Sequence, residues 1–575
     1  MSLLLALLDP GHAACSLELT GSHHVLPGDT IDVTWTGAGA HAEVYLSAHT
    51  NWGQAYHLST VTSNDGHHSW TLPDDLDHRD ELHLYVESAE HGARTTECWS
   101  YQEVDVAHRV DVGFGVDSLA DLTQNATLFS DVMRELTATA PKASNGLPNL
   151  TINQVSATGW AQGAELLPVS TVSGPLASIA DSSNLMVGLA DIPFSPAEAS
   201  CTALPNTLPA DEYGAYGPLD LLLSQRNDGT QHRVGFAPEF TTAMCPDSFD
   251  HGDYAAWVEE LAGDLSKAKG DISYETGNEP DGLYFFWGNA TSYDAKADAA
   301  YAGIRAADKD ATVTYGGFGS STVFDTGKVS NGWTSWDDFR ATLDDTPDES
   351  FSFHLFRNPG FGAYDGGQFE KTWDDLNGHR WPTTDADHVV LSAFDVFGRN
   401  TEKDADGEAI ESPWKIALED SSWLTYELAE LLFFLHERDI DAVYLWKLMD
   451  IGSEGQSGFF DECGNPRNGY GQLVEVWSVI EGGYSASREK SVVTIEGTNG
   501  LILQASADTQ FSHDKDMEIS SCWVDDLDET LLPSGPVGDD VSATWARMDW
   551  VVYRNVTLGA GSPCPSTVAT PPTCN

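Results

Sequence analysis

The spacing of apolar and polar residues divides the 575-residue chain into three parts. In the first part, residues 15–106, short segments in which apolar and polar residues alternate are separated by Gly, Asn and Asp clusters. A period of two residues is typical of half-buried β-strands, and regular turns between such strands indicate an all-β fold. We therefore predict an N-terminal, immunoglobulin-like β-sandwich over residues 15–106.

The second part, residues 107–485, alternates strand-like apolar segments with longer helical segments, such as 253–268 and 421–438. The candidate strands are rich in β-branched and aromatic residues and comprise 110–116, 150–157, 185–194, 233–240, 272–280, 312–319, 350–356, 388–398 and 441–450. This alternation predicts an α/β fold in which eight parallel strands close into an (α/β)8, or TIM, barrel. Since nine candidates are present, we assign 233–240 to a loop. A doubly wound open sheet is the alternative, but no Gly-rich phosphate-binding sequence follows the first strand.

The β pattern returns after residue 485 and predicts a C-terminal β-domain over residues 486–560, either a second sandwich or a sheet beside the barrel. Residues 561–575 are rich in Pro and Thr and are predicted to form a surface tail. Residues 1–14 contain an apolar run that resembles the end of a signal peptide, although no basic residues precede it. We therefore expect a secreted protein, and no later apolar run reaches the ~18 residues that span a bilayer.

Acidic residues outnumber basic residues by 89 to 28, which gives a formal net charge of −61. Such a charge excludes a general electrostatic surface for nucleic acid or for an anionic membrane. A surface rich in carboxylates stays hydrated in salt, so we predict a salt-adapted protein. An acidic secreted protein without salt adaptation is the alternative.

The eight cysteines form no closely spaced pair and no Cys/His pattern that binds zinc. Their even number and wide spacing fit structural disulfides formed in an oxidising compartment. Cys15 and Cys98 lie near the two ends of the predicted sandwich and are expected to pair, with two buried free thiols as the alternative. The acidic segments lack the regular ligand spacing of a calcium-binding loop, and no HExxH pattern appears, so we expect no metal and no cofactor.

The clearest chemical signal is the sequence Gly277-Asn278-Glu279-Pro280 at the end of a predicted strand. In a barrel, catalytic residues lie where strands end at the C-terminal face. Because strand side chains alternate, Glu275, Gly277 and Glu279 are expected to share one face, with Glu279 at the rim. A carboxylic acid at a partly enclosed rim can serve as a general acid, and Asn278 can bind a substrate hydroxyl. The alternative is that these residues only form the turn that ends the strand.

Five segments of the chain resemble glycoside hydrolase family 39, the β-xylosidase and α-L-iduronidase family of the large retaining-barrel clan. They are 254–293 with its Asn-Glu-Pro, 300–321 with its Gly pair, 350–356 (SFSFHLF), 441–452 (DAVYLWKLMDIG) and 457–482 with its Gly-Phe loop. The resemblance extends from about residue 110 to 485 and rests on the order and spacing of the segments. It implies a retaining β-glycosidase barrel that is accompanied by a β-sandwich.

The resemblance also implies roles for individual residues. Glu279 corresponds to the acid/base, His354 to the histidine that faces the sugar, and Trp446 to the sugar-stacking residue. His354 could equally be a barrel-interior histidine with internal partners. Trp287 and Tyr284 are further candidates for the cleft, because flat aromatic faces suit the C–H faces of sugar rings.

The main departure from the family is at the nucleophile, a glutamate at the end of the seventh strand in sequences such as Ser-Glu-Phe. This chain has Ser392-Ala393-Phe394 there. Three interpretations stay open: Ala393 is an inactivating substitution of Glu, Ala393 is natural in a carbohydrate-binding pseudoenzyme, or Asp395 replaces the missing carboxylate. The first is favoured because Ser392 and Phe394 fit a nucleophile strand. By alternation Leu391, Ala393 and Asp395 share one face, which puts Asp395 roughly 6.5 Å further along the strand.

These observations predict a secreted, retaining β-glycoside hydrolase that acts on a polysaccharide or oligosaccharide, such as a marine glycan, with no nucleic-acid or membrane partner. In the intact mechanism, a carboxylate at position 393 attacks the anomeric carbon. Glu279 protonates the departing oxygen and then activates water. Because Ala393 cannot attack, we expect this chain to bind its sugar and to turn it over very slowly.

Overall fold

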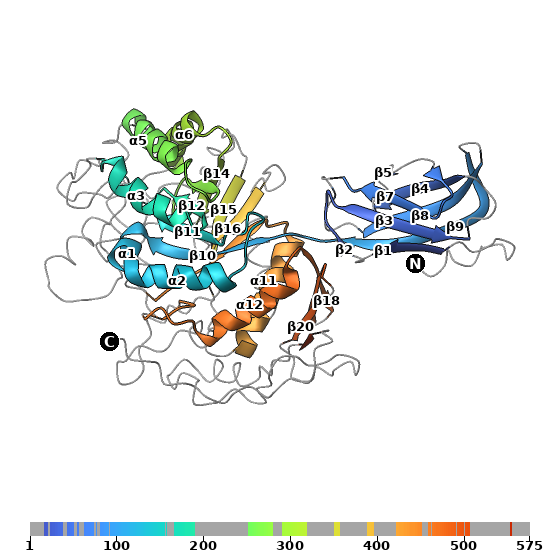
Figure 1. Ribbon diagram of the computed structural model, residues 1–575. Coiled ribbons are helices and arrows are strands. Elements are labelled where there is room, and N and C mark those ends of the chain that lie inside the picture. Colours follow the sequence, from blue (N-terminus) through green and yellow to red (C-terminus); the bar gives the residue numbers. More distant parts are fainter. Residues whose placement is uncertain are drawn as a thin grey trace, which may run out of the picture.

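The computed structural model describes the chain in segments, and the observations below concern these residues. They are residues 16–20, 24–37, 43–50, 55–56, 62–73, 76, 81–90, 93–155, 157, 166–189, 251–279, 290–318, 350–356, 388–395, 421–450, 458–461, 463–489, 492–499, 501–506 and 553–554. The molecule contains a barrel with surrounding helices, and a group of mostly antiparallel strands near the N-terminus lies to one side of it (Figure 1).

Eight parallel strands close into the barrel in chain order, and the last of them pairs with the first. These strands are β10 (Asp111–Ser118), β11 (Asn149–Gln154), β12 (Asn184–Gly188), β13 (Ile272–Glu275), β14 (Thr312–Phe318), β15 (Ser350–Phe356), β16 (His388–Asp395) and β17 (Ala442–Leu445). Residues in β11 and β14 are buried almost without interruption, as expected for strands that are covered on both faces. The predicted eight-stranded barrel is confirmed, and residues 233–240 lie outside the described part.

Helices cover the outside of the barrel (Figure 1). They are α1 (Leu119–Gln124), α2 (Ala126–Thr139), α3 (Val169–Ala180), α5 (His251–Leu265), α6 (Ala290–Ala307), α11 (Ser421–Glu437) and α12 (Asn468–Ile480). In α5 the buried residues Tyr254, Trp257 and Leu261 recur at the helical period of three to four. Trp257 is buried in the core, and its indole donates to the Leu167 carbonyl at 2.8 Å.

The strands of the barrel are not all in simple register. Between Tyr315 and Phe318, β14 uses three residues where β15 advances two, from Phe351 to Phe353. Between Leu391 and Phe394, β16 likewise uses three residues where β17 advances two. Each irregularity is a β-bulge, which inserts one residue and changes which side chains point to a given face. Both bulges lie toward the carboxyl ends of their strands.

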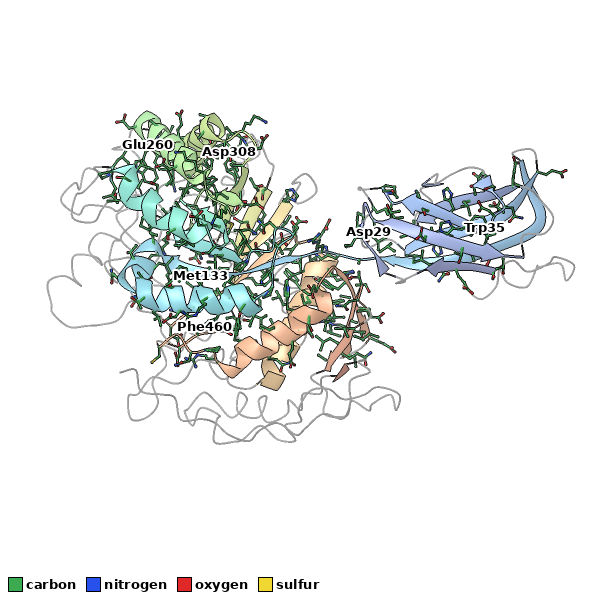
Figure 2. All side chains as sticks on the ribbon, in the orientation of Figure 1. Asp29, Trp35, Met133, Glu260, Asp308 and Phe460 are labelled. Atoms are coloured by element: carbon green, nitrogen blue, oxygen red, sulfur yellow. The ribbon has the colours of Figure 1, made fainter. Side chains whose placement is uncertain are left out.

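The N-terminal strands form two sheets. They are β1 (Ser16–Thr20), β2 (His24–Val25), β3 (Thr30–Thr36), β4 (Glu43–Thr50), β5 (Ala55–Tyr56), β6 (Thr62–Ser63), β7 (His67–Thr71), β8 (Glu81–Glu90) and β9 (Ala93–Val106). One sheet has the order β1-β3-β7, and the other has the order β2-β9-β8-β4-β5, with β6 paired to β4. Trp35 of the first sheet, labelled in Figure 2, belongs to the same buried cluster as Val86 of the second sheet. The two sheets therefore share a core, as predicted for a sandwich.

A four-stranded sheet follows the barrel. It consists of β18 (Tyr484–Glu489), β19 (Val492–Gly497), β20 (Ile502–Ser506) and β21 (Tyr553–Arg554), and its pairs are antiparallel. Mutual backbone hydrogen bonds between His108 and Tyr484 tie the start of this sheet to the segment that precedes β10. Cys463 forms a disulfide, whereas the predicted pairing of Cys15 with Cys98 involves a residue outside the described ranges. Among the described helices, none combines the length and the apolar character that a membrane span requires.

Candidate active site

The segment after β13 carries the predicted acid/base to the carboxyl end of the barrel. The strand ends at Glu275, whose side chain is fully buried, and Asn278 is also buried. Glu279 has a φ of 45°, so it does not continue the strand geometry, and its side chain is 21 % exposed. The predicted strand to residue 280 is therefore too long, and regular alternation does not extend from Glu275 to Glu279. Glu279 is brought to the rim by a left-handed turn instead.

Two contacts fix Glu279. Its backbone N–H donates to the Gly317 carbonyl on β14 at 2.6 Å. Its Oε1 lies 3.0 Å from His354 Nδ1, the distance at which an imidazole N–H donates to a carboxylate. The side chain of His354 is only 2 % exposed. Glu279 therefore has one oxygen held by a buried histidine while the carboxyl group keeps access to solvent.

His354 also lies beside the predicted nucleophile position. On the adjacent strands β15 and β16, His354 and Ala393 are register partners. Neighbouring strands are about 4.8 Å apart, so a side chain at position 393 starts one strand spacing from the histidine that contacts Glu279. Ala393 is fully buried. The structure thus brings Glu279, His354 and Ala393, all named from the sequence, to one end of the barrel.

The bulge in β16 changes the directions that were predicted for this strand. Phe353 pairs with Leu391, but the next residue, His354, pairs with Ala393, so Ser392 is the additional residue. The expectation that Leu391 and Ala393 share a face by simple alternation is wrong, because the inserted residue resets the alternation. Asp395 is the last residue of β16, with Phe356 as register partner. Its side chain lies outside the described part, as do Tyr284 and Trp287 altogether.

Trp446 follows β17 and is almost completely buried. Its backbone N–H donates to the Phe394 carbonyl at 2.7 Å, and the peptide bond between Trp446 and Lys447 is cis. Two glycines of β10 leave room for two aromatic residues, Tyr444 on β17 and Trp446 directly after it. A Cβ atom at Gly113 would lie 2.6 Å from the Tyr444 ring, and one at Gly115 would lie 2.8 Å from the Trp446 indole. The position of the Trp446 ring therefore depends on a neighbouring strand.

Replacing Gly115 with alanine should force the Trp446 indole to move. Overpacking of a dense interior costs about 1–3 kcal/mol, so we expect the free energy of unfolding in urea to fall by that amount. Gly471→Ala is the matched control, because a methyl group at this position of α12 would meet no atom within 4 Å outside its own helix. The control should match or slightly exceed the parent, since alanine favours helix. Equal stability of Gly115→Ala and the parent would contradict this account of the Trp446 position.

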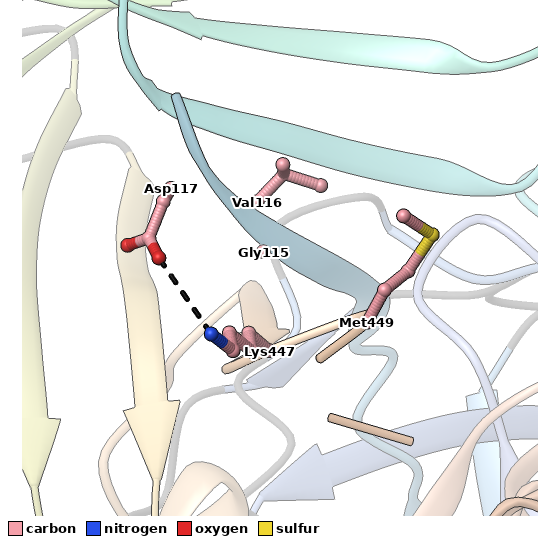
Figure 3. A pocket seen from close by; sticks show the side chains of 5 residues that line it. All are labelled: Gly115, Val116, Asp117, Lys447 and Met449. Carbon is pink, nitrogen blue, oxygen red and sulfur yellow. Dashed lines mark ion pairs between the residues drawn. The ribbon is translucent and has the colours of Figure 1, made fainter. Parts of the chain in front are cut away.

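A small pocket lies between residues of β10 and the segment that follows β17 (Figure 3). It is lined by Gly115, Val116, Asp117, Lys447 and Met449. The buried ammonium of Lys447 is 3.8 Å from Asp117 Oδ2, and the two groups point toward one another (Figure 3). The pair presents both donors and an acceptor, a combination that suits hydroxyl groups.

Ser352 and Glu275 form a buried, hydrogen-bonded pair near Glu279, and the sequence did not assign this pair to the site. Ser352 Oγ donates to Glu275 Oε1 at 2.5 Å, and burial raises the pKa of Glu275. The charge of His354 and the hydroxyls of Ser352 and Ser392 oppose that rise. Ser352 is two residues before His354 on β15, so the period of two could have placed it on the same inward face.

No cluster of three His, Cys, Asp or Glu side chains suited to a metal ion occurs among the described residues. The described site brings together carboxyl, imidazole, hydroxyl and ammonium groups. Among the described residues at this end of the barrel, the carboxyl groups of Glu279 and Asp117 are both partly exposed, at 21 % and 19 %. The buried Glu275 lies deeper, against hydroxyl groups.

No protein-family model matches the sequence, and no curated protein matches it. Among solved structures, a glucosidase from Croceicoccus marinus aligns over 72 % of this chain and 79 % of its own, with 13 % identity and a TM-score of 0.40. Lactobacillus rhamnosus β-glucuronidase aligns over 82 % and 68 %, with 13 % identity and a TM-score of 0.32. Ruminococcus gnavus β-glucuronidase aligns over 81 % and 67 %, with 11 % identity and a TM-score of 0.33. The barrel assignment rests on the closed strand order of this chain, and membership of family 39 stays a prediction.

Proposed function

We propose that this chain is a glycoside hydrolase of the retaining type, in which Glu279 is the acid/base and position 393 is that of the nucleophile. The observation that carries the proposal is the contact of Glu279 with His354, whose register partner is Ala393. A retaining enzyme needs its two carboxyl groups about 5–5.5 Å apart. A glutamate at 393 would begin one strand spacing from the histidine that holds Glu279, which suits that separation.

The reaction follows from these positions. A carboxylate at 393 attacks the anomeric carbon and expels the leaving oxygen, to which Glu279 gives its proton. Glu279, now ionised, takes a proton from water, and the water breaks the glycosyl ester with net retention. In the present chain Ala393 has no electron pair to offer, so the first bond cannot form by this route. We infer slow or undetectable hydrolysis and retained sugar binding.

Sugar binding is assigned to the rim around Glu279. Asn278 is placed to bind a hydroxyl, and the Trp446 indole supplies an apolar face for a pyranose ring. Tyr284 and Trp287 are proposed to extend the cleft. The substrate class is a polysaccharide or oligosaccharide, and secretion into a saline environment is part of the proposal because of the charge of −61 and the signal-like start.

A carbohydrate-binding pseudoenzyme is the second candidate. The observation that favours it is Ala393 itself, a fully buried methyl group where the catalytic cycle needs a carboxylate. A third arrangement keeps the enzyme active and uses Asp395, at the end of β16, as the nucleophile. These candidates differ in whether turnover needs an external nucleophile.

Azide separates the candidates in the chain as it stands. We expect turnover of dinitrophenyl β-glycosides to rise at least about tenfold with azide, because a small anion can occupy the space of the missing carboxylate. Attack from that side gives a glycosyl azide of inverted configuration, which NMR identifies. Asp395→Ala should respond to azide as the parent does.

Two other outcomes have definite meanings. Turnover that needs no azide and disappears in Asp395→Ala would assign the nucleophile to Asp395 and overturn the role of position 393. Tight glycan binding without turnover, with or without azide, across a broad panel of activated glycosides would favour the pseudoenzyme.

A further inference from the structure

A series of buried hydrogen bonds connects Glu275 to the backbone of Glu279 through two other strands. Gly317 N–H donates to Ser352 Oγ at 2.7 Å, so the Ser352 proton is left for Glu275 Oε1, at 2.5 Å. The Gly317 carbonyl accepts from the Glu279 N–H at 2.6 Å. The backbone N–H and the backbone carbonyl of Gly317 therefore connect the buried carboxyl group of Glu275, through Ser352, to the candidate acid/base Glu279.

We propose that Glu275 and Ser352 are positioning residues, which hold Glu279 in its catalytic orientation through the bulge at Gly316 and Gly317. The inference rests on the proposed function of Glu279 as acid/base. Neither residue touches the reacting atoms in this scheme, since both are buried beneath the rim.

The geometry of the bulge explains why it can transmit position. Gly316 and Gly317 have φ values of 134° and 67°, and glycine adopts these without a steric penalty. A Cβ atom at Gly316 would lie 2.2 Å from the Ser352 carbonyl oxygen, and one at Gly317 would lie 2.7 Å from the Gly277 carbonyl oxygen. The backbone of β14 is thus in close contact with β13 and β15 at once. A shift of Ser352 is passed to Gly317 and from there to Glu279.

Glu279 needs such support because its own backbone is strained. A φ of 45° is uncommon for a residue with a side chain and persists only where neighbouring contacts enforce it. Its N–H bond to Gly317 is one such contact, and the bond of its side chain to His354 is the other. His354 and Ser352 are both on β15, so this strand supports Glu279 directly through His354 and indirectly through the bond between Ser352 and Gly317.

Glu275 can perform this role without a charge. Burial raises its pKa, which favours the protonated acid, and the carbonyl oxygen of that acid accepts the Ser352 proton as a carboxylate would. The titratable groups that face it are His354 on β15 and Tyr444 on β17, and burial raises the pKa of Tyr444. Ser352 and Ser392 supply hydroxyls from β15 and β16. Glutamine at 275 keeps the acceptor, whereas methionine keeps the approximate volume and removes it.

Amide hydrogen exchange, resolved by residue, tests the connection in the chain as it stands and needs no activity. In Ser352→Ala and Glu275→Met, the Glu279 amide should exchange about tenfold faster or more, since local opening follows loss of its support. Glu275→Gln should keep the protection of the parent. Ser350→Ala is the matched control, because Ser350 is buried on the same strand but bonds Thr314 instead.

Parent-like protection of Glu279 in a folded Ser352→Ala would overturn the proposal. If that variant does not fold, Glu275→Met decides instead, because parent-like protection of Glu279 there would overturn the proposal. Unfolding midpoints of all variants identify any global loss of structure.

Kinetics test the catalytic consequence, with Ala393→Glu as the background. A displaced acid should lower kcat/KM for glycosides with poor leaving groups about tenfold or more and leave kcat/KM for dinitrophenyl glycosides little affected, because kcat/KM reports the first step alone. Glu275→Gln should keep the turnover of glycosides with poor leaving groups that Glu275→Met loses. Equal losses for both substrate types would indicate a merely structural role and overturn the proposal.

Absence of turnover in every variant, the background included, would contradict the proposed function, while the exchange data would still decide the connection itself.

Discussion

Ala393→Glu should raise the turnover of aryl β-glycosides by roughly 10³-fold or more, because removal of a covalent nucleophile costs a hydrolase at least that much. His354 and Ala393 are register partners, and His354 holds Glu279. A new carboxylate at 393 therefore enters a site whose acid/base is already in place. The measurement is the initial rate on a panel of aryl β-glycosides that differ in the sugar, for the parent and the variant.

Ala393→Gln is the matched control, since it has the size of glutamate but cannot attack the anomeric carbon. It should stay as slow as the parent. Azide should no longer accelerate Ala393→Glu, because the carboxylate occupies the space that the anion used. A folded Ala393→Glu that binds glycans but turns over none of the panel would contradict the assignment of position 393 and favour the pseudoenzyme.

The second large effect is expected at Glu279. In the Ala393→Glu background, Glu279→Gln should lower kcat/KM for glycosides with poor leaving groups by roughly 10²–10⁴-fold, the usual contribution of a general acid. Dinitrophenyl glycosides should lose much less in this first step, because dinitrophenolate leaves without protonation. The slope of log kcat/KM against the pKa of the leaving phenol measures the difference.

Glu260→Gln provides the control for loss of a carboxylate, since Glu260 is exposed on α5, on the outside of the barrel (Figure 2). It should leave the slope unchanged. Azide should accelerate Glu279→Gln as well, but here it attacks the glycosyl-enzyme from the opposite side and gives a product of retained configuration. A loss that is the same for all leaving groups would remove Glu279 from the role of acid/base.

The order of strands and helices can be predicted from the sequence because each element depends on its own residues. Continuous apolar segments such as 350–356 and helical periods such as that of Tyr254, Trp257 and Leu261 are local properties. Glu279 is identified in the same way, since an Asn-Glu-Pro sequence after a strand is visible without any partner. His354 is assigned through the resemblance, and its contact with Glu279 agrees with a place at the site.

The directions of particular side chains could not be predicted from the sequence. Alternation predicts that Glu275 and Glu279 point to the same face, but the left-handed backbone of Glu279 interrupts this segment. Alternation also predicts that Leu391 and Asp395 point to the same face, but the bulge at Ser392 interrupts that strand. A bulge depends on how one strand advances against its neighbours, and this information is not contained in either strand alone.

The sequence by itself determined the order of strands and helices that forms the barrel and the place of Glu279 after a barrel strand, because these follow from local periodicity and residue identity. The family resemblance assigns the nucleophile position to Ala393, and this assignment stays a prediction. Only the tertiary structure decided that Gly115 makes room for Trp446, that Ser352 bonds Glu275, and that Gly317 holds Glu279. Each of these contacts joins residues that are far apart in the chain and meet only when the strands close into a barrel. Their geometry is set by strand register and by close packing, which act between elements and leave no periodic pattern in the sequence.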